Sequence, residues 1–107
     1  MPFYVYILKC KDGSFYTGHT DDLEKRMNEH HEGCACSYTS SRLPVSLVYS
    51  QNFPTRLEAL ISERQIKGWS RKKKEALIRG DWEEISRLSN RKKLQASGRF
   101  NQDDYVK

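Results

Sequence analysis

Two apolar runs separated by a short polar turn open the chain, in the stretch FYVYILKCKDGSFYTG of residues 3–18. The first run, FYVYIL, is apolar at nearly every position, which is typical of a strand covered on both faces and therefore central in its sheet. Asp12 and Gly13 between the runs predict a hairpin. The runs carry tyrosine where core strands more often carry valine or isoleucine, at Tyr4, Tyr6 and Tyr16.

The length of the hairpin loop decides which of these residues share a face. A two-residue turn at Asp12 and Gly13 places Tyr6 and Tyr16 on opposite faces of the sheet. A three-residue loop with a bulge has Gly13 in the left-handed conformation and pairs Tyr6 with Gly18. Tyr6 and Tyr16 then lie on one face. We favour the bulged loop, because it gathers the tyrosines around the small Gly18 and leaves room there for a ligand or a backbone.

A helix is predicted next, over TDDLEKRMNEHHEG. Asp21 with Glu24 three residues later forms a capping box, and Gly33 is a stop signal. The stretch GCACSYTSSRL over residues 33–43 shows no clear period and is expected to be a loop.

Helical spacing places two polar residues of this helix beside its apolar edge, which Leu23 and Met27 form. Arg26 and His30 lie roughly 40° apart on the flank of that edge at the helical repeat of about 100° per residue. We expect both to border the buried face without being covered by it, as site residues often do.

A strand and three further helices are predicted in the rest of the chain. PVSLVYSQNF over residues 44–53 alternates as a strand does, with Val45, Leu47 and Tyr49 on one side. Thr55 with Glu58 then opens a helix. Its expected apolar stripe consists of Leu57, Leu60 and Ile61, with Glu63 off the centre of the stripe.

Gly68 is expected to end that helix. Ser70 caps the next one, SRKKKEALI, and Asp81 with Glu84 opens a last short helix, DWEEISRL. RKKLQASGRFNQDDYVK, from residue 91 on, has no period and few apolar residues, so a basic and polar disordered tail is expected over residues 90–107. The predicted organisation is a single domain over residues 1–89 followed by this tail.

Composition changes this picture little. The chain has 107 residues, of which 31% are charged and 36% hydrophobic, as in one soluble domain. It has no apolar run near the roughly 20 residues that a membrane helix needs, and no signal peptide. We therefore expect a cytoplasmic protein without a membrane partner.

The positive charge is concentrated in one segment. The net charge is +5, yet residues 1–63 carry six basic and eight acidic side chains, whereas residues 64–79 carry seven basic and one acidic. Such a density suits the neutralisation of nucleic-acid phosphates, although a solvated helix face is the plainer interpretation. The predicted nucleic-acid-binding residues are Arg42, Arg64, Lys67, Arg71, Lys72, Lys73 and Lys74.

The three cysteines, Cys10, Cys34 and Cys36, are an odd number in a chain without a secretion signal, which favours free thiols. The segment HHEGCAC also suggests zinc. Cys-x-Cys is an uncommon half-site, however, and no second pair follows at a usual spacing, so a zinc-stabilised interaction domain ranks far behind other interpretations.

Five residues form a candidate catalytic set: Tyr6, Tyr16, Arg26, His30 and Glu63. Hydrolysis of a phosphodiester needs a proton acceptor for water, a cation for the developing charge, and a proton for the leaving oxygen. A glutamate suits a magnesium ion completed by water and phosphate oxygens, and an arginine can fork onto phosphate oxygens. A tyrosine is a poor base at neutral pH unless a neighbouring cation or a histidine helps it.

Each member of the set also has a plainer interpretation. Tyrosine is a common strand former, and a helix arginine is usually solvated or ion-paired at the surface. His30 is often a polar cap on a core. Glu63 stands four residues before Lys67, which is the spacing of an intrahelical ion pair.

The ordered pattern of YVY at residues 4–6, YTG at 16–18, LEKR at 23–26, His30 and Glu63 resembles the GIY-YIG nuclease superfamily. With Arg42-x-Pro44-Val45 and ERQIK at residues 63–67, the chain is similar to its small stand-alone bacterial branch, an uncharacterised protein family. The resemblance covers about residues 3–79. In the motifs, Tyr4 replaces a glycine and Thr17 an isoleucine, neither of which supplies chemistry. His19 follows the second motif, where it could assist a tyrosine.

The resemblance implies an α+β domain with a three-stranded antiparallel sheet flanked by helices, and cleavage of DNA with one divalent ion, Mg²⁺ or Mn²⁺. Tyr6 and Tyr16 would be the motif tyrosines, one of them acting as or helping the general base, and Gly18 the motif glycine. Arg26 would be the catalytic arginine, His30 its accompanying histidine and Glu63 the metal ligand.

Two function classes remain open at this point. The first is a metal-dependent endonuclease acting on DNA, for instance branched, nicked or damaged DNA, with its own basic surface or a protein partner supplying substrate targeting. The second is a non-catalytic nucleic-acid-binding module that keeps the nuclease fold. Retention of Tyr6, Tyr16, Arg26 and Glu63 favours the first.

Overall fold

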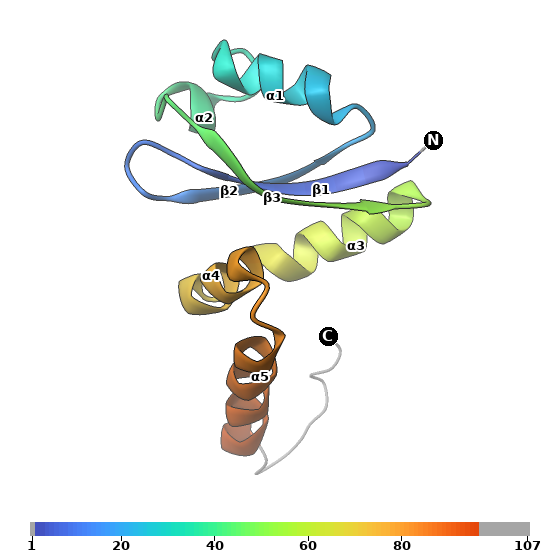
Figure 1. Cartoon of the computed structure of the whole chain (residues 1–107), viewed down its shortest axis with the longest axis vertical. Helices are drawn as coiled ribbons and strands as arrows, with labels where there is room; N and C mark the ends of the chain where they lie inside the picture. Colours follow the sequence, from blue (N-terminus) through green and yellow to red (C-terminus); the bar gives the residue numbers. More distant parts are fainter. Residues whose placement is uncertain (1, 97–107) are drawn as a thin grey trace. The chain divides into compact units, whose positions relative to one another are not determined.

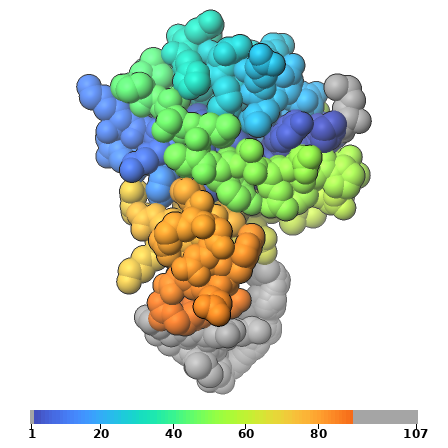
Figure 2. All heavy atoms as spheres, in the orientation of Figure 1, coloured from blue at the N-terminus to red at the C-terminus, as the bar shows by residue number. Residues whose placement is uncertain are grey.

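A three-stranded antiparallel sheet with the order β2-β1-β3 organises the first part of the computed structural model, which describes residues 2–96 (Figure 1). Its strands are β1 (Phe3–Lys9), β2 (Phe15–Thr20) and β3 (Ser46–Phe53). The central position of β1 confirms the prediction made from its continuous apolar run. β3 is an edge strand, and Figure 2 shows it in green along the surface.

The hairpin has the bulged register that the sequence favoured. Tyr6 pairs with Gly18, and Leu8 pairs with Tyr16. Gly13 has a φ of 86°, a left-handed conformation that side chains rarely adopt, so a glycine is needed there. The motif tyrosines consequently lie on one face of the sheet.

Helices cover both faces of the sheet. α1 (Leu23–His31) and α2 (Ser37–Ser40) cover the face of Tyr6 and Leu8, and α3 (Arg56–Lys67) covers the opposite face (Figure 1). We call these the α1 face and the α3 face. The core of the α1 face consists of Tyr6, Leu8, Cys10, Met27 and Val45. The predicted fold class, a three-stranded antiparallel sheet with flanking helices, is confirmed.

Local details correct three predictions. The cap of α1 is Asp22, whose side chain accepts a hydrogen bond from the Lys25 amide, so the predicted cap at Asp21 was one residue early. The predicted loop over residues 33–43 contains the short helix α2. β3 begins at Ser46, two residues later than predicted.

A bulge in β3 overturns the predicted face of that strand. Leu47 pairs with Leu8 and Tyr49 with Ile7, with a register shift between them. Since Leu8 and Ile7 point to opposite faces, Leu47 and Tyr49 do too. The alternating pattern in the sequence could not reveal the inserted residue.

The buried side of α3 also differs from the predicted stripe. Leu57 and Ile61 are 65% and 56% exposed, whereas Ala59, Glu63 and Ile66 are buried. The small side chain of Ala59 suits close packing against β1 and β2, which α3 contacts. Glu63 therefore faces the sheet instead of lying off the buried stripe.

The described residues divide into two compact units, residues 2–67 and residues 68–96. In the second unit, α4 (Arg71–Arg79) begins after Ser70, which caps it as predicted, and α5 is Trp82–Ala96. Asp81 caps α5 by accepting a hydrogen bond from the Glu84 amide. α5 is longer than the predicted helix, because it continues through residues 90–96. The remainder of the expected tail, residues 97–107, lies outside the described residues.

Candidate active site

Tyr6 lies flat across Gly18 at the centre of the α1 face. A Cβ atom on Gly18 would be 2.6 Å from the Tyr6 hydroxyl oxygen and 3.2 Å from Cε2 of Tyr16. The space that we expected above Gly18 is therefore filled by the two tyrosine rings, and the glycine is required by their packing. The Tyr6 side chain is almost completely buried, with a residue exposure of 1%.

A hydrogen-bonded chain leads from Tyr6 to α2 through His30. The Tyr6 hydroxyl is 2.9 Å from Nε2 of His30, and Nδ1 of His30 is 2.8 Å from Oγ1 of Thr39. His30 and Thr39 are fully buried, so His30 does not merely border the buried face as predicted. Both ring nitrogens of His30 are engaged, which argues against the zinc site that the segment HHEGCAC suggested.

The hydrogen bonds also define the protonation of His30. Burial lowers the pKa of His30, and the nearby charge of Arg26 lowers it further, so the ring is neutral at pH 7. A neutral imidazole donates from one nitrogen and accepts at the other. If Nδ1–H donates to Thr39, Nε2 accepts the proton of the Tyr6 hydroxyl.

Tyr16 packs beside this chain and is tied to the α2 segment by Cys36. Its ring centroid is 6.4 Å from that of Tyr6 and 5.4 Å from that of His30. The Cys36 thiol hydrogen-bonds the side chain of Tyr16 and lies 3.4 Å from Oγ1 of Thr39. Cys36 and Thr39 thus connect the two motif tyrosines through side chains. Neither residue belongs to a periodic pattern that would have pointed to this role.

Both motif tyrosines keep their protons at neutral pH. Burial raises the pKa of Tyr6 well above its ordinary value, and the charge of Tyr16 would raise it further. Burial also raises the pKa of Tyr16 to about 12, with a further contribution from the hydrogen bond to Cys36. Arg26 lowers both pKa values and Glu63 raises both, so these two charges act on the tyrosines.

Arg26 lies on α1 next to an open pocket. Its Nε is 3.2 Å from Oε1 of Glu29, and its side chain is 37% exposed. The pocket extends to Tyr4 and Asp22. This surface ion pair is weak enough for a phosphate to replace Glu29 as the partner of the guanidinium.

Glu63 approaches the site from the α3 face. Its Oε1 is 2.5 Å from Nδ1 of His19, and its Oε2 is 2.8 Å from Nζ of Lys67. Burial raises the pKa of the Glu63 carboxyl, but these two partners outweigh burial and lower it, so the group is ionised at neutral pH. His19 therefore bonds Glu63 and does not assist a tyrosine as expected. The plain interpretation of Glu63 and Lys67 as an intrahelical pair is also correct.

The donors present suit one hard divalent ion. No three His, Cys, Asp or Glu side chains within residues 2–96 are grouped to hold a metal ion. Mg²⁺ does not need such a group, since it keeps several waters and binds through one or two carboxylates plus substrate phosphates. Glu63 is an ionised carboxylate that already attracts the ammonium of Lys67. A metal ion held by Glu63, water and phosphate oxygens is consistent with this arrangement.

The predicted nucleic-acid-binding residue Arg42 has partners within the protein. Its Nε is 3.0 Å from Oδ2 of Asp12, and its guanidinium carbon is 3.9 Å from the centroid of the Tyr38 ring. The Tyr38 ring in turn lies 5.8 Å from that of Tyr16. Arg42 therefore supports the packing around Tyr16.

The remaining basic residues lie on two helices. Arg64 and Lys67 are exposed residues of the last turn of α3. Lys73 lies 4.5 Å from the centroid of the Trp69 ring, and Arg71 forms an ion pair with Glu75 in α4. The four predicted binding residues of the second unit are Arg71, Lys72, Lys73 and Lys74.

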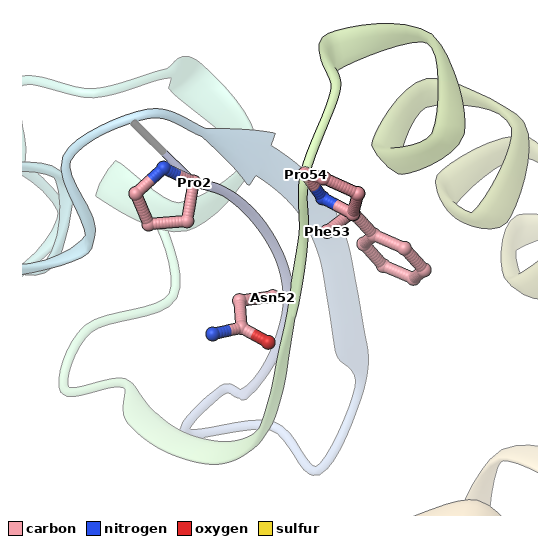
Figure 3. A pocket seen from close by; sticks show the side chains of 4 residues that line it. All are labelled: Pro2, Asn52, Phe53 and Pro54. Carbon is pink, nitrogen blue, oxygen red and sulfur yellow. The ribbon is translucent and has the colours of Figure 1, made fainter.

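A second pocket lies where β1 begins and β3 ends. Pro2, Asn52, Phe53 and Pro54 line it (Figure 3). None of these side chains titrates or carries charge, so this pocket offers no acid, base or phosphate ligand. Among the helices of residues 2–96, none is long and apolar enough to cross a membrane.

Comparisons with known proteins agree with this geometry. The chain matches the family model of the GIY-YIG catalytic domain over residues 2–76. It is 53% identical over 75 residues to a UPF0213 protein of Staphylococcus saprophyticus, covering 70% of this chain and 92% of that protein. A UPF0213 protein of Halalkalibacterium halodurans is 45% identical over 92 residues, covering 83% and 98%. The solution NMR structure of the protein EF2693 from E. faecalis has a TM-score of 0.53 at 39% identity, covering 75% of this chain and 85% of that one.

Proposed function

We propose that this chain, which belongs to the GIY-YIG family, is a metal-dependent endonuclease that hydrolyses DNA phosphodiester bonds. The observation that carries the proposal is the hydrogen bond between the Tyr6 hydroxyl and Nε2 of His30, held above Gly18 and beside Tyr16. A buried tyrosine that is bonded to a neutral histidine can pass a proton to it. Packing of the two rings alone would not require this hydrogen bond.

Proton movement in this proposal follows the hydrogen bonds. As the attacking water loses a proton to the Tyr6 oxygen, the proton of Tyr6 moves to Nε2 of His30. Tyr6 stays neutral throughout, so its raised pKa does not prevent the transfer. Thr39 accepts from Nδ1 of the resulting imidazolium and holds the ring in place. The attack breaks the bond between phosphorus and the leaving oxygen, and that oxygen takes its proton from solvent water. His30 returns its proton to solvent afterwards, which balances the reaction.

Arg26 and Glu63 stabilise the negative charge of the phosphate in this proposal. β2 is an edge strand, so a phosphate at its free edge can be approached from both faces of the sheet. Arg26 binds the nonbridging oxygens from the α1 face, and Glu63 holds a Mg²⁺ or Mn²⁺ ion from the α3 face. The metal ion, when bound, stabilises the negative charge that develops in the reaction. Gly18 keeps the motif tyrosines close together.

Binding of the DNA itself falls to the basic residues of α3 and α4. Contacts from lysine and arginine to phosphates carry no sequence information and weaken as salt rises. A branched, nicked or damaged site, or a protein partner that delivers the substrate, would then supply the selectivity. Arg42 contributes to the site indirectly, because it packs against Tyr38.

The test is cleavage of labelled linear, nicked, flapped and branched DNAs with Mg²⁺ or Mn²⁺. The wild type is compared with Arg26→Ala and Glu63→Ala, and Lys11→Ala, which removes an exposed basic side chain from the hairpin loop, is the surface control. Metal-dependent cleavage that both site variants lose and the control retains supports the proposal. Cleavage that survives both variants, or no cleavage of any DNA, contradicts it.

Two observations favour the alternative of a non-catalytic nucleic-acid-binding module. Both carboxylate oxygens of Glu63 already have partners, His19 and Lys67, and both motif tyrosines have raised pKa values. Salt-sensitive DNA binding that persists in Arg26→Ala and Glu63→Ala, without cleavage by the wild type, would support this alternative.

A further inference from the structure

The carboxylate of Glu63 is shared between two partners that differ in their freedom to move. His19 is bonded to Oε1 and is 26% exposed, whereas Lys67 is bonded to Oε2 and is 52% exposed. The Glu63 side chain itself is 10% exposed. Few directions of approach to its oxygens therefore remain, and the approach to Oε2 passes the ammonium of Lys67.

We infer that Lys67 is an internal cation that competes with the divalent metal ion for Oε2 of Glu63 and must leave before the ion binds. The inference rests on the proposed function. A Mg²⁺–oxygen bond is about 2.0–2.1 Å long, so an ammonium 2.8 Å from the same oxygen lies close enough to a bound ion to repel it strongly at this little-exposed site. The two cations therefore compete for Oε2.

Lys67 is the partner that can move. It is the last residue of α3, and its charge is carried on a flexible four-carbon chain. His19 comes from the rigid strand β2 and can stay on Oε1, where it orients the carboxylate as outer partners of metal ligands do. Release of Lys67 into solvent thus opens Oε2 while the orientation of the carboxylate is kept.

The burial of the Glu63 carboxylate explains why Lys67 stays bonded to it in the metal-free protein. A carboxylate at 10% exposure is costly without a compensating charge. Lys67 supplies that charge in the metal-free protein, and the metal ion supplies it in the loaded protein. Once released, the ammonium is free to bind a DNA phosphate, so metal and DNA should strengthen each other's binding.

The test measures Mn²⁺ affinity of the full chain without DNA, from the electron paramagnetic resonance signal of free Mn²⁺. Lys67→Gln should bind Mn²⁺ about tenfold more tightly than the wild type, because the ion no longer displaces a charged hydrogen-bond partner. Arg64→Gln is the matched control, since it removes one exposed positive charge from the same turn of α3 and should change the affinity far less. Circular dichroism of each variant verifies folding.

The double variant Lys67→Gln with Glu63→Gln separates the two ways of failing. We expect the double variant to lose the tighter Mn²⁺ binding of Lys67→Gln, which would place the ion on Glu63. A Glu63-dependent Mn²⁺ affinity that Lys67→Gln leaves unchanged, or raises no more than Arg64→Gln does, overturns the competition while the proposed function stands. Mn²⁺ binding that does not depend on Glu63 in any background overturns both.

A second measurement tests the coupling to DNA. In the Arg26→Ala background, which should not cleave, Mn²⁺ should increase the affinity for a labelled duplex, measured by fluorescence anisotropy. Lys67→Gln should reduce the ratio of the DNA affinities measured with and without Mn²⁺. Arg64→Gln should weaken DNA binding under both conditions and leave that ratio unchanged. An equal increase in all three chains would contradict the inferred release of Lys67 to phosphate.

Discussion

The two faces of the sheet stabilise their buried polar side chains in different ways. On the α1 face, Tyr6, His30 and Thr39 are neutral groups joined by hydrogen bonds of 2.8–2.9 Å. On the α3 face, Glu63 is a charged group held by His19 and by the ammonium of Lys67. A chain of neutral groups can pass a proton along its hydrogen bonds, whereas a buried carboxylate can attract a cation.

This difference assigns separate tasks to the two faces in the proposed reaction. Proton transfer belongs to the α1 face and cation binding to the α3 face, and β2 lies between them as an edge strand. Tyr6 and Tyr16 respond to the charge of Glu63, so the faces are electrostatically coupled. Substitutions that remove one group from one face should therefore have distinguishable effects.

The largest expected effect is on catalysis by the α1 face. Tyr6→Phe removes the hydroxyl that bonds His30, and should reduce the cleavage rate by about 10²–10⁴-fold, the range of general acid–base contributions. Single-turnover cleavage measures this. Tyr49→Phe, which removes a tyrosine hydroxyl that donates to Gln51 within β3, is the matched control and should cleave at nearly the wild-type rate. Equal rates for Tyr6→Phe and wild type would exclude the relay.

The second-largest effect is expected from a change in packing on the α1 face. Gly18→Ala places a Cβ atom 2.6 Å from the Tyr6 hydroxyl, so the Tyr6 ring or β2 must shift. Overpacking of this kind should lower the free energy of unfolding by about 1–3 kcal/mol, measured by urea denaturation. Ser50 pairs with Tyr6 from β3 and is exposed, so Ser50→Ala should be close to neutral. An unchanged urea midpoint for Gly18→Ala would contradict the packing.

Thr39 tests whether the neutral chain is held by hydrogen bonds. Thr39→Val keeps the shape but leaves Nδ1 of the buried His30 without its partner, which should lower the free energy of unfolding by about 1–3 kcal/mol. Thr39→Ser retains the hydroxyl and should be affected less. Urea denaturation of both variants gives the comparison. A Ser variant that is less stable than the Val variant would mean that the methyl group contributes more to stability than the hydroxyl does.

Thr17 is the buried threonine of the α3 face that corresponds to Thr39. Its replacement by valine should change the free energy of unfolding in the opposite direction. Its hydroxyl is buried, and it is the one buried side-chain polar atom in the described part of the chain without a hydrogen-bond partner. Thr17→Val removes an unsatisfied group, so it should raise the free energy of unfolding by about 1 kcal/mol. Thermal and urea denaturation measure the change. Destabilisation by Thr17→Val would show that the hydroxyl has a partner in solution, such as water.

The sequence predicted the α1 face better than the α3 face, for local reasons. Asp12 and Gly13 with the spacing of the tyrosines predicted the register of Tyr6 and Gly18. The caps at Ser70 and Thr55 were also predictable, because each depends on residues within one turn. Local patterns therefore gave the hairpin and most of the helix starts.

Contacts between distant segments could not be predicted in this way. The bond from His30 to Thr39 depends on how the α2 segment folds back, and that segment shows no period. The buried side of α3 was misjudged because Leu57 and Ile61 are more apolar than Glu63, whose burial depends on His19, 44 residues away in the chain. A charge that is neutralised by a distant partner has no signature in hydrophobic periodicity.

The smallest expected effect is a difference in the pH at which each face loses stability. Burial holds the pKa of His30 below its ordinary value of 6.5, so the unfolded chain takes up a proton there that the folded chain refuses. The stabilising contribution is therefore complete above pH 6.5 and is lost as the pH falls below it. Despite its burial, Glu63 has a pKa below its ordinary 4.5, owing to Lys67 and His19, so its contribution is complete above pH 4.5 and is lost below.

Urea denaturation across this pH range should resolve the two windows, because one group contributes a slope of at most about 1.4 kcal/mol per pH unit. His30→Gln should flatten the curve of unfolding free energy just below pH 6.5, and Glu63→Gln should flatten it below pH 4.5. The shape of each curve is the readout, so a uniform loss of stability does not obscure it. If the wild type instead gained stability as the pH fell through 6.5, and His30→Gln removed that gain, the pKa of His30 would be raised in the folded protein, and a neutral proton acceptor on the α1 face would be excluded.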